Sequence, residues 1–132
     1  MKNLKLIGSR ITRINAERNV DFTGKLEIKT NIKINKFQKI EDRKNSIKIP
    51  YEYEINYGEL GKVNIKGELF LSGDSKIIKE LMKITNNKEK NTPEYLKITN
   101  LIIQKATIKA FELEEELNLP IHIKLPEIKA QS

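Results

Sequence analysis

The side chains best suited to chemistry gather near the C-terminal end of the chain. Four carboxylates, those of Glu112, Glu114, Glu115 and Glu116, are followed by the only histidine, His122. Helical residues three or four positions apart share a face, so Glu112 lies beside Glu115 or Glu116. Such a pair could bind a cation or act as an acid and a base. We favour a solvated helix face or an interface with basic residues, because carboxylates near a helix C-terminus oppose the helix dipole and call for a partner charge.

The remaining catalytic signatures are absent from the sequence. His122 has no second histidine and no cysteine to complete a typical zinc site, and we interpret it as a satisfied or solvated surface histidine. The glycines match no phosphate-binding loop, since no Gly-Lys-Ser/Thr motif occurs. No serine lies in a Gly-x-Ser-x-Gly setting. We therefore predict that the protein is not an enzyme and has no cofactor and no metal.

The length and composition predict one domain over residues 1–132. A chain of 132 residues can bury a sizeable core without stabilisation by disulfides or metal ions. It contains no cysteine, so it has no disulfide framework. No apolar run is long enough for a signal peptide or a membrane span. We expect a cytoplasmic protein that is not inserted in a membrane.

The net charge of +7 is concentrated in the first part of the chain. Residues 1–50 carry a net charge of +8, whereas residues 51–132 carry −1. A basic half is compatible with nucleic-acid binding. However, lysines such as Lys29 and Lys33 recur at the spacing of a solvated strand face, and no aromatic residues alternate with them to stack on bases. The solvated sheet face is the favoured interpretation.

The first half of the chain is predicted to form an antiparallel sheet. Apolar and polar residues alternate over residues 26–34, 47–57 and 63–71, which is typical of strands with one buried face. An earlier strand within residues 4–18 changes phase along its length, which a bulge or bend explains. A turn is expected over residues 57–61 and a polar loop over residues 39–46.

The second half is predicted to be helical and to end in an extended arm. Asp74 can cap a first helix, and Thr92 followed by Pro93 begins a longer one that reaches about residue 118. The long helix is apolar on more than one side, which predicts an interface between subunits. The fold class is therefore α+β, with a four-stranded antiparallel sheet (residues 1–72), two helices (residues 74–118) and an arm (residues 119–132).

Alternation of apolar and polar residues also characterises the arm. Pro120 and Pro126 lack N–H donors, so this segment cannot lie inside a sheet. It must cover a surface of its own subunit or of another molecule. Much of the apolar area offered by sheet, helix and arm is expected to be ordinary core, but part of it could line a groove for an unfolded chain or an extended peptide. The residues concerned are Tyr51, Tyr53, Tyr57, Phe70, Phe111, Leu119, Ile121, Ile123 and Leu125.

This order of elements resembles the SecB-type protein-export chaperones, and the sequence is most similar to their archaeal branch. The resemblance extends from about residue 9 to residue 128. It is carried by three stretches, which are Tyr-Glu-Ile-Asn-Tyr at residues 53–57, Val-Asn-Ile-Lys-Gly-Glu-Leu-Phe-Leu-Ser-Gly at residues 63–73, and Glu-Leu-Asn-Leu-Pro-Ile-His-Ile-Lys-Leu-Pro at residues 116–126.

The resemblance implies an ATP-independent holdase for non-native polypeptides, assembled as a homotetramer that is a dimer of dimers. Some relatives serve toxin–antitoxin pairs instead of exported proteins. The family's acidic sheet face, which docks on the translocation motor in bacteria, is replaced here by a basic half. The groove that the resemblance implies for client polypeptides consists of Tyr53, Tyr57, Phe70, Phe111, Leu119, Ile121, Ile123 and Leu125.

Three functions remain to be compared. A holdase binds many unfolded polypeptides, and salt should weaken that binding little. A nucleic-acid-binding module loses affinity steeply as salt rises. An adaptor, including an antitoxin-associated chaperone, binds one partner and does not suppress aggregation in general.

Overall fold

The computed structural model describes residues 4–19, 24 and 26–122. In chain order the elements are β1 (Lys5–Arg18), β2 (Lys29–Ile34), β3 (Gln38–Lys39), β4 (Ser46–Asn56), a short 3-10 helix (Gly58–Leu60), β5 (Gly61–Ser72), α1 (Ser75–Asn87) and α2 (Pro93–Glu116). A five-stranded antiparallel sheet is thus followed by two helices. The predicted α+β class is confirmed, with a two-residue fifth strand added to the four predicted ones.

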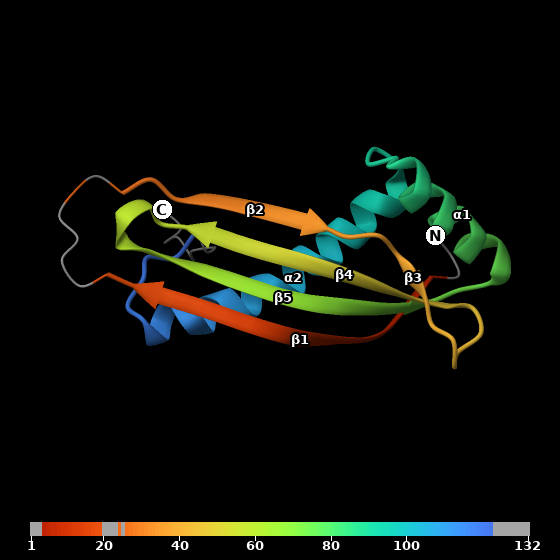
Figure 1. Ribbon diagram of the computed structural model, residues 1–132, viewed down its shortest axis with the longest axis horizontal. Coiled ribbons are helices and arrows are strands. Elements are labelled where there is room, and N and C mark those ends of the chain that lie inside the picture. Colours follow the sequence, from red (N-terminus) through yellow and green to blue (C-terminus); the bar gives the residue numbers. More distant parts are fainter. Residues whose placement is uncertain (1–3, 20–23, 25, 123–132) are drawn as a thin grey trace, which may run out of the picture.

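The four long strands lie in the order β1-β5-β4-β2, and β3 pairs with the beginning of β4. All neighbours are antiparallel, as the alternating arrow directions show (Figure 1). The prediction for β2 was too long, since its strand begins at Lys29 and not at residue 26. The predicted loop over residues 39–46 was wrong at both ends, because Lys39 belongs to β3 and Ser46 begins β4.

Strand β1 forms one edge of the sheet and carries apolar residues on its exposed surface. Its pairing with β5 shifts register between Leu6 and Gly8 and again between Ile11 and Arg13, which confirms the irregularity expected from the phase change. Leu6, Ile7, Ile11 and Ile14 are all exposed. An edge strand of this length with exposed apolar side chains is suited to further contacts.

The core lies between one face of the sheet and α2. The odd-numbered residues from Ile47 to Ile55 on β4 are buried, as are Val63, Ile65, Leu69 and Leu71 on β5. Because strand side chains alternate between faces, the even-numbered residues point outward. Helix α2 contributes to the core with its buried residues Ile98, Ile102, Ala106, Ala110 and Leu113.

Local capping fixes where the helices begin and where α1 ends. The Asp74 side chain accepts a hydrogen bond from Ile77 N at 2.9 Å, and Thr92 accepts one from Tyr95 N at 3.3 Å. Both predicted N-caps are confirmed. Helix α1 ends where Lys88 adopts a left-handed conformation (φ 54°), and its N–H bonds to the last turn of the helix.

Helix α1 lies at one end of the sheet, and α2 runs from that end to the other (Figure 1). In Figure 1, α1 lies at the end where β2 and β5 finish, and α2 starts beside it and runs behind the sheet to the opposite end. At 1.5 Å per residue, Tyr95 and Glu114 are about 28 Å apart along α2. Each end of this helix contributes to a distinct site.

Candidate functional site

A buried polar cluster lies at the C-terminal end of α2. We call it the Glu114 cluster, and it comprises Tyr53, Tyr57, Glu114 and His122. Glu114 is 1 % exposed and accepts hydrogen bonds from the Tyr57 hydroxyl and from His122 N, the latter at 3.1 Å. His122 Nδ1 lies 2.9 Å from one carboxylate oxygen and 3.0 Å from the other. The cluster joins β4, α2 and the segment after α2.

The carboxylate determines the roles of the histidine nitrogens. A carboxylate accepts but does not donate, so Nδ1 carries the hydrogen that faces Glu114. In a neutral imidazole, Nε2 then accepts from the Tyr53 hydroxyl, 2.7 Å away. Burial, followed by the hydrogen bond to Glu114, raises the pKa of Tyr57 far above its ordinary value. Burial also raises the pKa of Tyr53, so both tyrosines remain neutral donors at physiological pH.

The expectation for Glu114 was wrong, and the one for His122 was wrong in part. Glu114 does not belong to the solvated helix face, although Glu112, Glu115 and Glu116 do. His122 is hydrogen-bonded through both ring nitrogens, as the satisfied alternative predicted, but its side chain is fully buried and so is not a surface group. Three donors from two segments converge on Glu114, namely the Tyr57 hydroxyl and the N and Nδ1 of His122. This satisfied network stabilises polar groups that would otherwise be costly to bury.

The arm departs from the predicted alternation where the structure describes it. Leu119 is buried, but Ile121, which should share its side, is 51 % exposed, and the His122 side chain is turned inward instead. The physical reason is the pair of polar partners, Glu114 and Tyr53, that hold His122. Ile123 and Leu125 lie outside the described residues.

The other predicted groove residues separate into two locations. Phe111 is half-buried, with its ring centroid 5.6 Å from that of His122, so it lies beside the Glu114 cluster, to which Tyr53 and Tyr57 belong. Tyr53 and Tyr57 are 1 % and 0 % exposed and belong to the core of this chain. Phe70 lies on the opposite face of the sheet, as its parity predicted.

On that outer face, Phe70 is part of a charged surface. Arg10 lies over its ring at 5.4 Å and also bonds to Glu68 at 2.6 Å. Partial burial acts to raise the pKa of Glu68. The hydrogen bond from Arg10 and the positive charge of Lys48 together outweigh this effect, so the pKa of Glu68 lies below its ordinary value. Phe70 and the groove candidates near Glu114 therefore cannot contact the same short segment of a partner.

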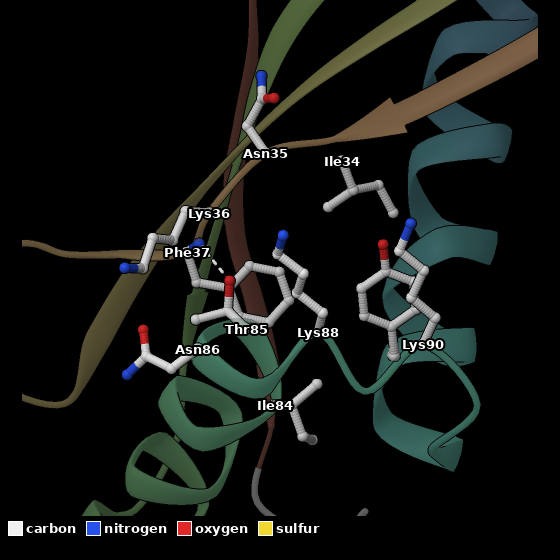
Figure 2. A pocket seen from close by; sticks show the side chains of 10 residues that line it. Ile34, Asn35, Lys36, Phe37, Ile84, Thr85, Asn86, Lys88 and Lys90 are labelled. Atoms are coloured by element: carbon white, nitrogen blue, oxygen red, sulfur yellow. Dashed lines mark hydrogen bonds between the residues drawn. The ribbon is translucent and has the colours of Figure 1, made fainter.

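A second site, at the start of α2, was missed by the sequence analysis. A pocket of about 310 Å³ opens between the β2–β3 connection, the end of α1 and the beginning of α2 (Figure 2). We call it the lysine pocket. Its apolar lining is formed by Ile34, Phe37, Ile84 and Tyr95, and its polar lining by Asn35, Lys36, Thr85, Asn86, Lys88 and Lys90.

The walls of the lysine pocket are held together by specific contacts. Phe37 N donates to the Thr85 hydroxyl at 3.0 Å, which joins the β2–β3 connection to α1 (Figure 2). The rings of Phe37 and Tyr95 stack with centroids 6.3 Å apart and planes 15° from parallel. The pocket depends on three segments far apart in sequence, and only the clustering of Lys88 and Lys90 beside a helix end could have pointed to it.

The part of the chain that the structure describes offers few other chemical groups. Within residues 4–19, 24 and 26–122, no three histidine or carboxylate side chains are grouped to hold a metal ion. In the same residues, no helix combines the length and apolar character needed to cross a membrane.

Comparison with known proteins finds similar solved structures but no similar family model or curated sequence. Among solved structures, the chain is similar to the Mycobacterium tuberculosis SecB-like chaperone Rv1957 in complex with a ChAD peptide from the Rv1956 HigA1 antitoxin. The TM-score is 0.63 at 8 % sequence identity, and the match covers 96 % of this chain and 91 % of that chain. The likeness shows a SecB-like fold.

Proposed function

We propose that the chain is an ATP-independent chaperone of the archaeal SecB-like branch, which holds unfolded or non-native polypeptides in the cytoplasm, with a link to protein export. The observation that carries the proposal is the fold likeness, over nearly the whole chain, to a SecB-like chaperone in complex with a peptide. The exposed apolar residues of β1, α2 and the arm support it, since each large side chain buried against a client contributes about 1.5–3 kcal/mol.

The Glu114 cluster gives the proposed client surface its shape. Ile121 is exposed, and Phe111 is half-buried beside the ring of His122, so both can contact a client, together with the predicted contacts Ile123 and Leu125. Tyr53 and Tyr57 support this surface from the core and hold the start of the arm through His122 and Glu114. Phe70 would serve a separate client contact on the outer face.

Aggregation measurements test the proposal. A chemically unfolded model protein is diluted with or without this chain, in the absence of nucleotide and at two salt concentrations. We expect suppression at substoichiometric amounts of the chain and little change with salt, because salt does not weaken apolar burial. Ile121→Ser should weaken client binding about tenfold, since it removes an exposed apolar contact.

Glu116→Ser provides the matched control, because Glu116 is also exposed and lies near the same end of α2. It should leave suppression unchanged. A folded chain that suppresses no aggregation at either salt concentration would contradict the holdase.

A second candidate is a chaperone dedicated to one partner, such as an antitoxin. The specific observation in its favour is the antitoxin peptide in the similar structure. This function predicts tight, saturable binding of a single peptide sequence without general suppression of aggregation. Steep weakening of binding by salt, with a preference for oligonucleotides, would instead favour the nucleic-acid alternative.

The proposed homo-oligomer, a dimer of dimers, makes a separate prediction. Leu96 and Ile108 on α2 are 53 % and 62 % exposed, so a second subunit that covered them would bury apolar area. We expect Ile108→Lys to reduce the oligomeric mass by about half or more, because a buried lysine opposes an apolar interface. Sedimentation velocity measures this change. The control is Asn31→Lys, which adds a lysine at an exposed position of β2 that pairs with Glu54 on the outer face of the sheet, away from α2, and it should keep the wild-type mass.

A further inference from the structure

The lysine pocket combines an apolar floor with a rim of a single charge sign. Phe37 and Ile84 are buried and Ile34 and Tyr95 are half-buried, so the floor consists of well-packed apolar side chains. Burial raises the pKa of Tyr95 above its ordinary value, so its hydroxyl stays neutral. A volume of about 310 Å³ is small for a ligand pocket and suits one or two large side chains of a peptide.

The rim is positive. Lys36, Lys88 and Lys90 are exposed, and no aspartate or glutamate lines the pocket, although Glu89 lies between two of these lysines in the sequence. In Figure 2 the side chains of Lys88 and Lys90 extend in the direction of Ile34. Within the described residues none of the three lysines forms an ion pair. An incoming carboxylate would therefore meet ammonium groups that no carboxylate among the described residues already pairs with.

The pocket is preformed. Asn35 N donates to Pro50 O at 2.9 Å, and Phe37 N donates to the Thr85 hydroxyl at 3.0 Å, so the β2–β3 connection is fixed to both β4 and α1. The left-handed conformation of Lys88 turns the chain at the end of α1 and places Lys88 and Lys90 beside the opening. A ligand thus gains the contacts without ordering the walls first.

We infer that the lysine pocket binds polypeptide segments in which a large apolar side chain is flanked by aspartate or glutamate. The inference rests on the proposed function and specifies which clients the chaperone prefers. A peptide fits better than a nucleic acid. Phe37 is only 2 % exposed and stacks on Tyr95, so it does not offer a free ring face for a base.

Binding of short labelled peptides, followed by fluorescence anisotropy, tests this inference. Three peptides share one apolar core and differ only in flanking residues, which are aspartate and glutamate, asparagine and glutamine, or lysine. Each exposed ion pair contributes about two- to fivefold in affinity. We therefore expect the acidic peptide to bind about tenfold more tightly than the amide peptide at low salt, and this difference to shrink as salt rises.

Two triple variants test whether the preference for the acidic peptide depends on the lysines of the lysine pocket. The pocket variant combines Lys36→Gln, Lys88→Asn and Lys90→Gln, where asparagine tolerates the left-handed conformation at residue 88. The control combines Lys62→Gln, Lys66→Gln and Lys76→Gln, which removes the same charge from exposed positions outside the pocket. The pocket variant should bind the acidic and amide peptides equally, whereas the control should keep the preference.

The outcomes separate this inference from the proposed function. If wild type binds the acidic and amide peptides equally, or if the pocket variant keeps the preference, the inference is overturned while the holdase stands. If no peptide binds and no aggregation is suppressed, both fail. If a single-stranded oligonucleotide displaces the acidic peptide and binds more tightly at the same lysines, the pocket is a nucleic-acid site and the inference is likewise overturned.

Discussion

Replacement of Glu114 by alanine is expected to lower the free energy of unfolding by about 3–5 kcal/mol, the cost of removing one partner from a buried charged network. The variant leaves the Tyr57 hydroxyl, His122 N and His122 Nδ1 without their common acceptor. Each orphaned buried donor carries a desolvation cost. Urea denaturation measures the change, and faster proteolysis after residue 118 should accompany it, because His122 no longer anchors the arm.

The control for this experiment is Glu116→Ala, at an exposed position two residues further along α2. It should change the free energy of unfolding by less than about 0.5 kcal/mol. If Glu114→Ala were as mild as this control, the Glu114 cluster would not be an energetic link between the arm and the core.

Gly61→Ala is expected to lower the free energy of unfolding by about 3 kcal/mol or more, through steric overlap added to backbone strain. At Gly61, φ is 155°, and an added Cβ would overlap the backbone oxygen Glu17 O. That oxygen belongs to the backbone of β1, where Arg18 pairs with Gly61. The clash can be relieved only by separating the end of β1 from β5, and thermal or urea unfolding measures the cost.

Gly58→Ala is the matched control for backbone conformation alone. Gly58 also has a positive φ, 65°, but an added Cβ would meet nothing within 4 Å. The expected cost is about 1–2 kcal/mol for the left-handed conformation. Equal losses for the two variants would contradict the steric argument at Gly61.

The fold could be predicted from sequence because its determinants are local. Alternation on β4 and β5 marks the buried face of each strand, and the Asp74 and Thr92 caps need only the next few residues. The two-residue strand β3 was missed for the opposite reason. It is defined by its pairing with Lys48 and Ile47 on another strand, and two residues carry no period of their own.

The Glu114 cluster and the lysine pocket could not be predicted from the sequence, because both depend on contacts between segments that are distant along the chain. Glu114 resembles its three acidic neighbours in sequence, and only the fold brings Tyr57 and His122 to it. The lysine pocket likewise requires Phe37 to stack on Tyr95 across separate elements. Lysine spacing alone identified the solvated face of β2, but it could not show that Lys36, Lys88 and Lys90 surround one opening.

The separation of the two sites along α2 sets a length rule for any segment held at both. The helix places Tyr95 and Glu114 about 28 Å apart, and an extended chain advances about 3.3 Å per residue. A segment therefore needs about nine residues to reach from the lysine pocket to the client surface around Phe111 and Ile121 at the other end of α2. Shorter segments engage one end only and lose the gain in effective concentration that a second attachment gives. The chain would thus act as a molecular ruler that favours long unfolded stretches over short exposed loops.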